Sequence, residues 1–257
     1  MKIERGREAL VTGHRYAHPP IVEAVCEFRF EPGDWDNAIP GLIWERVKVL
    51  FPKRRDAVRL EFQSVPGPGG FEQRVIQQPL IQYLQEDEKL FMQVGPSVLT
   101  VNRLAPYASW QEFKPLIQQA FEVYSEQASP KATTRIGLRY INRFELPGDK
   151  VDLEDILEFR PYMGKELPKD HASFTVGAEF LFEQNRDVLR LQVASTKPLR
   201  ESRLALILDL DYFSLLPDTS VCADIGEWLE VAHRHIEDAF EASITDSLRR
   251  TFEETSQ

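Results

Sequence analysis

Charged side chains alternate along several segments of this 257-residue chain and could together form a binding site for an anion. The candidate ligand-binding residues are Glu23, Glu27, Arg29, Arg135, Arg139, Arg143, Arg190, Asp209 and Asp211. Guanidinium groups recognise carboxylates and phosphates through paired hydrogen bonds. On the concave side of a curved sheet, these residues would line a trough for a nucleotide, a phosphate compound or an acidic peptide. The alternative is a solvated face with weak cross-strand ion pairs.

Other spacings could hold a metal ion, but each is incomplete. His233 and Glu237 are four residues apart, as are His14 and His18, and both sets lack a third ligand. His233 is expected on the solvated side of a helix. A polyphosphate-processing tunnel would need a Glu-x-Glu-x-Lys strand, whereas this chain has only Glu27-Phe28-Arg29. We therefore expect neither a metal nor a cofactor.

Nucleophilic catalysis has no recognisable set of residues in this sequence. There is no Gly-x-Ser-x-Gly motif, and neither Cys26 nor Cys222 has a plausible base near it in sequence. The glycine-rich segment at residues 66–70 is not followed by the Lys-Ser/Thr pair of a phosphate-binding loop. The sequence therefore favours a non-enzymatic function and leaves catalysis open.

An aromatic group at a predicted helix start is a candidate partner-binding site. It consists of Arg103, Tyr107 and Trp110, with Phe113 one turn further on. Such a group could capture a peptide or stack on a base. The alternative is a hydrophobic staple that fixes the entry into the helix.

Alternation of apolar and polar residues predicts the strands that would position these side chains. We expect strands at residues 21–30, 57–63, 71–85, 90–94, 98–104, 133–146, 174–182, 188–196 and 203–213. Helical spacing predicts helices at 38–51, from Ser109 to about Gln127, and from Asp224 to about Phe252, with a short helical stretch at 153–159. Ser109-x-x-Glu112 and Asp224-x-x-Glu227 are helix-capping patterns.

This order of elements predicts an α+β fold, because too few helices alternate with strands for a parallel sheet. We expect a strongly curved, mainly antiparallel sheet packed on two or three helices, including a long C-terminal helix. One domain over residues 1–257 is expected. A divergent duplication, with halves at 19–146 and 173–257 joined by 147–172, remains open.

Composition limits the compartments and partners. The formal charge of −10 disfavours nucleic-acid binding, unless Lys53, Arg54, Arg55 and Arg59 form a continuous basic stripe. Two distant cysteines do not indicate a disulfide framework. No apolar run is long enough to cross a membrane, and the charged first residues are unlike a signal peptide. We expect a soluble cytoplasmic protein without membrane contact.

Several motifs together resemble a family of bacterial proteins. They are Pro19-Pro20-Ile21-Val22-Glu23-Ala24-Val25, Val101-Asn102-Arg103-Leu104 with Pro106-Tyr107, Arg135 to Arg143, Leu208-Asp209-Leu210-Asp211 and the segment from Trp228 to Phe252. The family is sporadically distributed, has about this chain length and has no assigned function. The resemblance implies no catalytic residues. Its patchy distribution implies an accessory role, such as a defence or toxin–antitoxin-like module.

The functional expectation is a binding or regulatory protein that recognises a protein or peptide, with a protein partner or a homodimer expected. The alternative is an enzyme or sensor for an anionic nucleotide or phosphate ligand in the Arg- and Glu-lined sheet face.

Overall fold

The computed structural model describes residues 16–67, 70–148, 151–168, 172–199, 203–214 and 225–252. The strands are β1 (Ile21–Glu31), β2 (Lys53–Gly67), β3 (Gly70–Leu84), β4 (Leu90–Gly95), β5 (Val98–Leu104), β6 (Ala132–Pro147), β7 (Thr175–Phe182), β8 (Asp187–Thr196) and β9 (Arg203–Ser214). The helices are α1 (Ile39–Val47), α2 (Trp110–Ala128), α4 (Ile225–Ser243) and α5 (Asp246–Arg249), with short 3-10 turns η1 (Leu153–Asp155), η2 (Glu183–Asn185) and η3 (Arg250–Phe252).

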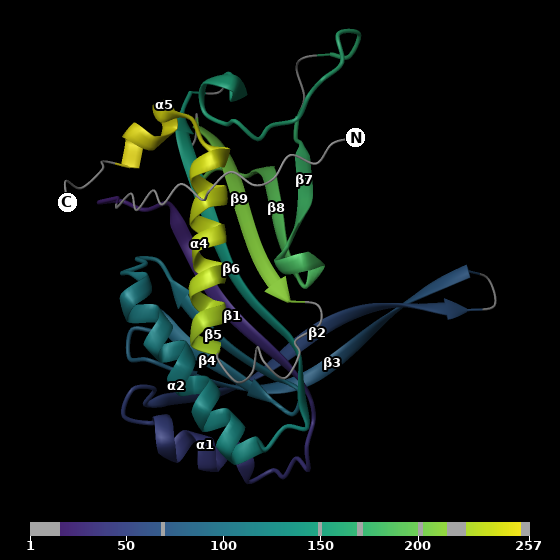
Figure 1. The fold of residues 1–257 in the computed structure, drawn as a ribbon, viewed down its shortest axis with the longest axis vertical. Coiled ribbons are helices and arrows are strands. Elements are labelled where there is room, and N and C mark those ends of the chain that lie inside the picture. The colour runs from purple at the N-terminus through teal and green to yellow at the C-terminus, as the bar shows by residue number, and fades with distance from the viewer. Residues whose placement is uncertain are drawn as a thin grey trace. The chain divides into compact units, whose positions relative to one another are not determined.

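The described strands form a nine-stranded antiparallel sheet in the order β2-β3-β4-β5-β1-β6-β9-β8-β7, which confirms the α+β class. Within this order the sheet is not closed, so β2 and β7 are its edge strands (Figure 1). The strong curvature and the duplication remain predictions. No helix among the described residues is long and apolar enough to cross a membrane.

The chain divides into two compact units. Among the described residues, the first unit contains those up to Glu23, those of Leu138–Phe213 and those from Glu227 onward. The second contains those of Ala24–Gly137 and Ser214–Gly226. Strands β1 and β6 therefore contribute residues to both units.

The core of the second unit lies between the sheet and α2. Phe28 and Phe30 of β1 are buried, as the alternation predicts, and their rings pack on α2. The ring centroid of Phe28 is 4.8 Å from that of Phe121, and Phe30 is 4.7 Å from Tyr124. Contacts of this kind add to the hydrophobic gain from burial. They leave the other face of β1, with Glu27 and Arg29, directed away from α2.

The helices of the second unit start and end for local reasons. Helix α2 is capped by the Ser109 side chain, which accepts a hydrogen bond from the Glu112 amide, so the predicted cap is confirmed. Helix α1 is shorter than predicted, ending at Val47, although Phe51 is still buried. The Tyr83 hydroxyl of β3 donates to the Pro40 carbonyl of α1 at 2.6 Å. This contact places α1 on the same side of β3 as Tyr83.

In the first unit, α4 covers one face of the strands. The ring of Tyr212 on β9 lies 5.7 Å from Trp228, and Tyr140 on β6 lies 6.0 Å from His233. The prediction of one helix reaching Phe252 is wrong, because α4 ends at Ser243. The next residue, Ile244, forms an isolated bridge with Leu157, and the Thr245 side chain caps α5. The predicted cap residue Asp224 lies outside the described residues.

Candidate functional site

Three arginines surround Glu27 in the second unit. Glu27 Oε1 accepts hydrogen bonds from Arg29 Nε and Arg135 Nη1, each at 3.0 Å. Glu27 Oε2 lies 2.8 Å from Arg59 Nη1. Burial raises the pKa of the Glu27 carboxyl, but the charges of Arg59 and Arg29 outweigh it and hold that pKa below its usual value. Glu27 therefore stays ionised and is unsuited to act as a general acid near neutral pH.

The contact between Arg59 and Glu27 spans an unexpected distance in the sheet. Strands β3, β4 and β5 lie between β2 and β1 in the strand order. At about 4.8 Å per strand, β2 and β1 would be about 19 Å apart in a flat sheet. The ion pair is therefore much shorter than the separation of these two strands in a flat sheet. Sequence spacing gave no sign of this contact, which depends on how the strands are arranged in the sheet.

In the second unit, a row of polar side chains crosses the face of the sheet that is opposite α1. Arg55, Gln82, Gln93 and Thr100 each stand directly opposite the next, one on each strand from β2 to β5. Gln82 accepts from Arg55 and donates to Gln93, which donates to Thr100 at 3.0 Å. Thr100 is buried. These side chains satisfy one another, which suits a structural or recognition role better than acid–base chemistry.

The charged residues of the first unit form separate ion pairs. Arg139 donates from Nε to Asp209 at 2.7 Å, and this hydrogen bond, with the charges of Asp209, Asp211 and Glu23, raises the pKa of the Arg139 guanidinium. Arg143 bonds the Glu145 carboxylate and the Lys197 carbonyl. Arg190 donates to Glu179 at 2.8 Å.

The structure thus groups seven of the nine predicted residues in two sets, whereas Arg143 and Arg190 pair with Glu145 and Glu179 instead. Glu27, Arg29 and Arg135 meet in the second unit, whereas Glu23, Arg139 and the two aspartates lie together in the first. Among the described residues, no group of three or more His, Cys, Asp or Glu side chains could hold a metal ion. A ligand role for either set remains a prediction.

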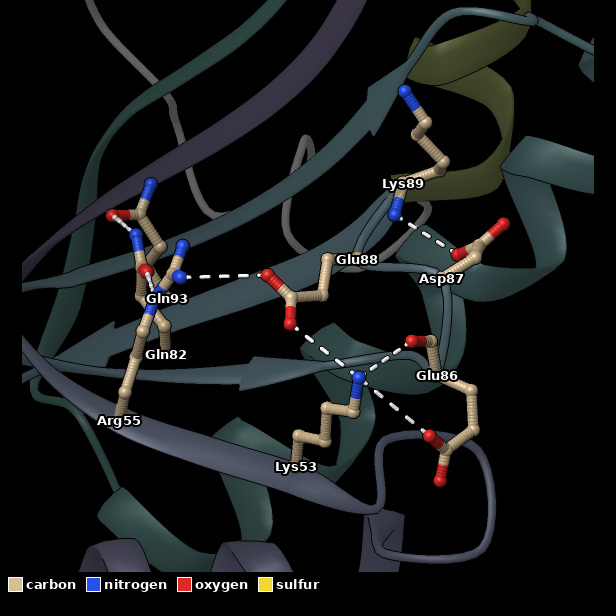
Figure 2. A network of polar contacts seen from close by, with 8 residues as sticks. All are labelled: Lys53, Arg55, Gln82, Glu86, Asp87, Glu88, Lys89 and Gln93. Atoms are coloured by element: carbon tan, nitrogen blue, oxygen red, sulfur yellow. Dashed lines mark hydrogen bonds and ion pairs between the residues drawn. The ribbon is translucent and has the colours of Figure 1, made fainter.

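The basic residues at the start of β2 contact neighbouring side chains, although Lys53, Arg54 and Arg55 are exposed. Figure 2 shows Lys53 between Glu86 and Glu88, with its Nζ donating to the Glu86 carbonyl at 2.6 Å. Arg55 reaches Glu88 and Gln82. Arg54 lies over the ring of Trp44.

The predicted aromatic partner site lies partly inside the protein. Trp110 is buried, Arg103 and Tyr107 are half-buried, and the Tyr107 ring packs edge-on against Phe113 at 6.1 Å. This geometry fits the hydrophobic-staple alternative. Partner binding through these three residues remains a prediction.

Two histidines of α4 have surroundings that the sequence did not indicate. His233 was expected on the solvated side of the helix, which is wrong: only 13% of its side chain is exposed. Burial lowers the pKa of His233 to about 4 and raises that of Glu237, 3.5 Å away, to about 7. His235 stacks on Tyr212 and packs at a tilt against Phe182. The aromatic neighbours come from β6, β7 and β9, so helical periodicity alone could not reveal them.

The strand β7 is an unusual edge strand. It runs Thr-Val-Gly-Ala-Glu-Phe-Leu-Phe, contains no Lys or Pro, and exposes 43% of Phe180 and 61% of Leu181. Its one charged residue, Glu179, is paired with Arg190 of β8. No described strand pairs with its outer side. Natural edge strands are usually protected by charges, prolines or bulges, as the basic residues of β2 illustrate.

No protein-family model matches the chain, and no curated protein matches it.

Proposed function

We propose that this is a non-enzymatic binding protein that recognises a protein partner by adding a β-strand of that partner to the edge of β7. The observation that carries the proposal is the unprotected edge of β7, with Phe180 and Leu181 exposed on its two faces. In strand addition, main-chain hydrogen bonds supply affinity and alternate side chains supply specificity.

The main-chain groups of β7 that face outward follow from one hydrogen bond. The Ser195 amide donates to the Phe174 carbonyl at 3.0 Å, so Phe174 belongs to a hydrogen-bonded pair with β8. The N–H and C=O of one residue point to the same side of a strand, and the side alternates. Thr175, Gly177, Glu179 and Leu181 therefore direct these groups away from β8, where a partner strand can bind them.

The charged sites support binding rather than catalysis. Glu27 and Asp209 each accept hydrogen bonds from arginine. The Arg59 and Arg29 charges hold the pKa of the Glu27 carboxyl below its usual value, so Glu27 lacks the raised pKa of a general acid.

The wider setting is part of the same proposal. We place the protein in the bacterial cytoplasm, as a regulatory component of an accessory defence or toxin–antitoxin-like module. The support is the family resemblance of residues 19–25 and 135–143 described above.

The proposal is tested by capturing partners from the source organism with tagged wild-type protein and with Leu181→Lys. The added charge should block strand addition. Leu199→Lys is the matched control, because Leu199 is also exposed, at 80%, but lies outside β7. We expect the wild type and Leu199→Lys to capture the same protein and Leu181→Lys to lose it. Titration of the three variants with the purified partner should show the same difference in binding. Equal binding by all three overturns the proposal.

A second candidate function rests on the three guanidinium groups around Glu27. An anionic nucleotide or phosphate compound could bind there through forked hydrogen bonds. Calorimetry with pyrophosphate and with a nucleoside triphosphate tests this candidate. Saturable binding that is lost in Arg59→Ala but kept in Arg46→Ala supports it, since Arg46 pairs with an exposed glutamate elsewhere.

A further inference from the structure

We infer that the strand that pairs with β7 is β7 of a second copy of this chain, in an antiparallel dimer with Ala178 on the two-fold axis. This inference rests on the proposed function, because it names the partner of the same edge. In a two-fold interface, each surface element meets its own copy, so a strand can pair with itself only if its sequence is self-complementary.

The outward main-chain groups match in this register. With Ala178 opposite the partner's Ala178, Gly177 is opposite the partner's Glu179, and Thr175 is opposite the partner's Leu181. Thr175, Gly177, Glu179 and Leu181 are the four residues that direct N–H and C=O away from β8. Every outward group of β7 therefore acquires a hydrogen-bonding residue across the interface.

The exposed apolar side chains also gain neighbours. Phe180 is opposite the partner's Val176 on one face, which forms an aromatic–β-branched pair of the kind that stabilises sheets. Leu181 is opposite the methyl-bearing Thr175 on the other face. Both Phe180 and Leu181 are exposed in the single chain. Pairing thus removes the two largest apolar surfaces of this edge from water.

Charge selects this register over its neighbour. Centring the pair on Glu179 would place two glutamates directly opposite, which is unfavourable. Centring it on Ala178 places each Glu179 opposite a glycine, and each carboxylate keeps its pair with Arg190 of its own chain, 2.8 Å away.

The other edge does not favour self-pairing. The first seven residues of β2 include Lys53, Arg54, Arg55, Asp56 and Arg59. Lys53 and Arg55 are held in the network of Figure 2 with Glu86 and Glu88. Charges along an edge strand oppose pairing with another strand. The single, internally paired charge of β7 offers no such opposition.

Disulfide trapping tests the register directly in a Cys222→Ser background, since Cys26 is fully buried. Ala178 and its counterpart form a non-hydrogen-bonded pair, with Cα atoms about 4.5 Å apart, within the range of about 4.4–6.8 Å that a disulfide spans. Ala178→Cys should therefore give a covalent dimer on mild oxidation. Leu181→Cys is the matched control, because its two copies would be about 20 Å apart at about 3.3 Å per residue. Mixing Leu181→Cys with Thr175→Cys should restore the cross-link.

The outcomes separate this inference from the function on which it rests. Trapping of Ala178→Cys but not of Leu181→Cys, with a dimer of the wild type in sedimentation, is the expected result. Equal trapping at both positions overturns the register. A wild-type monomer that captures another protein through β7 overturns the dimer and leaves the proposed function standing. A monomer that captures nothing through β7 overturns both.

Discussion

Glu179 accepts a hydrogen bond from Arg190 at 2.8 Å across the β7–β8 pair. This ion pair joins the one charged residue of β7 to β8. The negative charge of Glu179 is therefore already balanced within the chain. Phe180 and Leu181, which follow it, remain exposed. The edge therefore combines open main-chain groups with apolar side chains, which are the two requirements for strand addition.

Proline at residue 181 should abolish partner pairing without unfolding the protein. Leu181 directs its N–H outward, and proline is tolerated where an edge N–H faces solvent. Leu181→Pro should keep the wild-type circular dichroism spectrum and sediment as a monomer. Ala178→Pro is the opposite case, because the Ala178 N–H faces β8. We expect only Ala178→Pro to lose its folded structure. A Leu181→Pro protein that still forms a dimer would contradict pairing through the outer side of β7.

Gly33 should tolerate no side chain. A Cβ atom at Gly33 would lie 2.4 Å from the Ser129 carbonyl oxygen, a backbone atom that cannot rotate away. Gly33→Ala should lower the free energy of unfolding by roughly 1–3 kcal/mol, because overpacking destabilises a core by this amount. Urea unfolding measures this loss.

Gly41 in α1 is the matched control for Gly33. A Cβ atom there would meet nothing within 4 Å. Gly41→Ala should stabilise the protein by about 0.5–1 kcal/mol, because alanine loses less conformational entropy in a helix. Equal effects of the two substitutions would contradict the contact between Gly33 and Ser129.

The Glu27 carboxylate should contribute more to stability than an exposed glutamate does. Only 16% of its side chain is exposed, and it bonds Arg29 and Arg135. Glu27→Gln should cost roughly 1.5–3 kcal/mol, the range for hydrogen bonds to charged groups. Glu45→Gln should cost at most about 0.5 kcal/mol, because Glu45 is 58% exposed beside Lys48. Similar losses for both variants in urea unfolding would refute the difference.

His233 should make the protein less stable as the pH falls through mild acid. Burial lowers the pKa of this imidazole to about 4 in the folded protein, whereas a histidine exposed to water in the unfolded chain has a pKa of about 6.5. Unfolding therefore takes up a proton at this ring between these pH values, and the contribution of His233 to the free energy of unfolding falls as the pH drops from about 6.5 to 4. Glu237, whose pKa is raised to about 7, contributes in the opposite sense over this range. His233→Phe should remove the His233 contribution, so the free energy of unfolding of this variant should fall less than that of the wild type between these pH values. An NMR titration of the His233 ring with its midpoint near 6.5 would refute the shift.

Local patterns were sufficient to predict most elements. Apolar alternation placed β1 and the hairpin of β4 and β5 within a residue of their observed ends, and Ser109 marked the start of α2. These features depend on neighbours in sequence, which a pattern reports directly. The break after Ser243 escaped prediction, and the residue that follows, Ile244, bridges the distant Leu157, a contact that no local pattern reports.

The candidate sites were less predictable because they depend on strand order. Alternation correctly placed Glu27 and Arg29 on the face opposite Phe28, but it could not show that Arg59 reaches Glu27. The exposed edge of β7 has the same origin. Its sequence alternates like that of an interior strand, and only its terminal position in the sheet makes it an edge.

Amide hydrogen exchange along β7 tests the central claim most directly. The amides of Gly177, Glu179 and Leu181 face outward, whereas those of Ala178 and Phe180 bond β8. In the assembled protein, at concentrations where sedimentation shows a complex, we expect all five amides to exchange slowly. Dilution to the single chain should release only the three outward amides. Outward amides that exchange rapidly in the complex would contradict strand addition at β7.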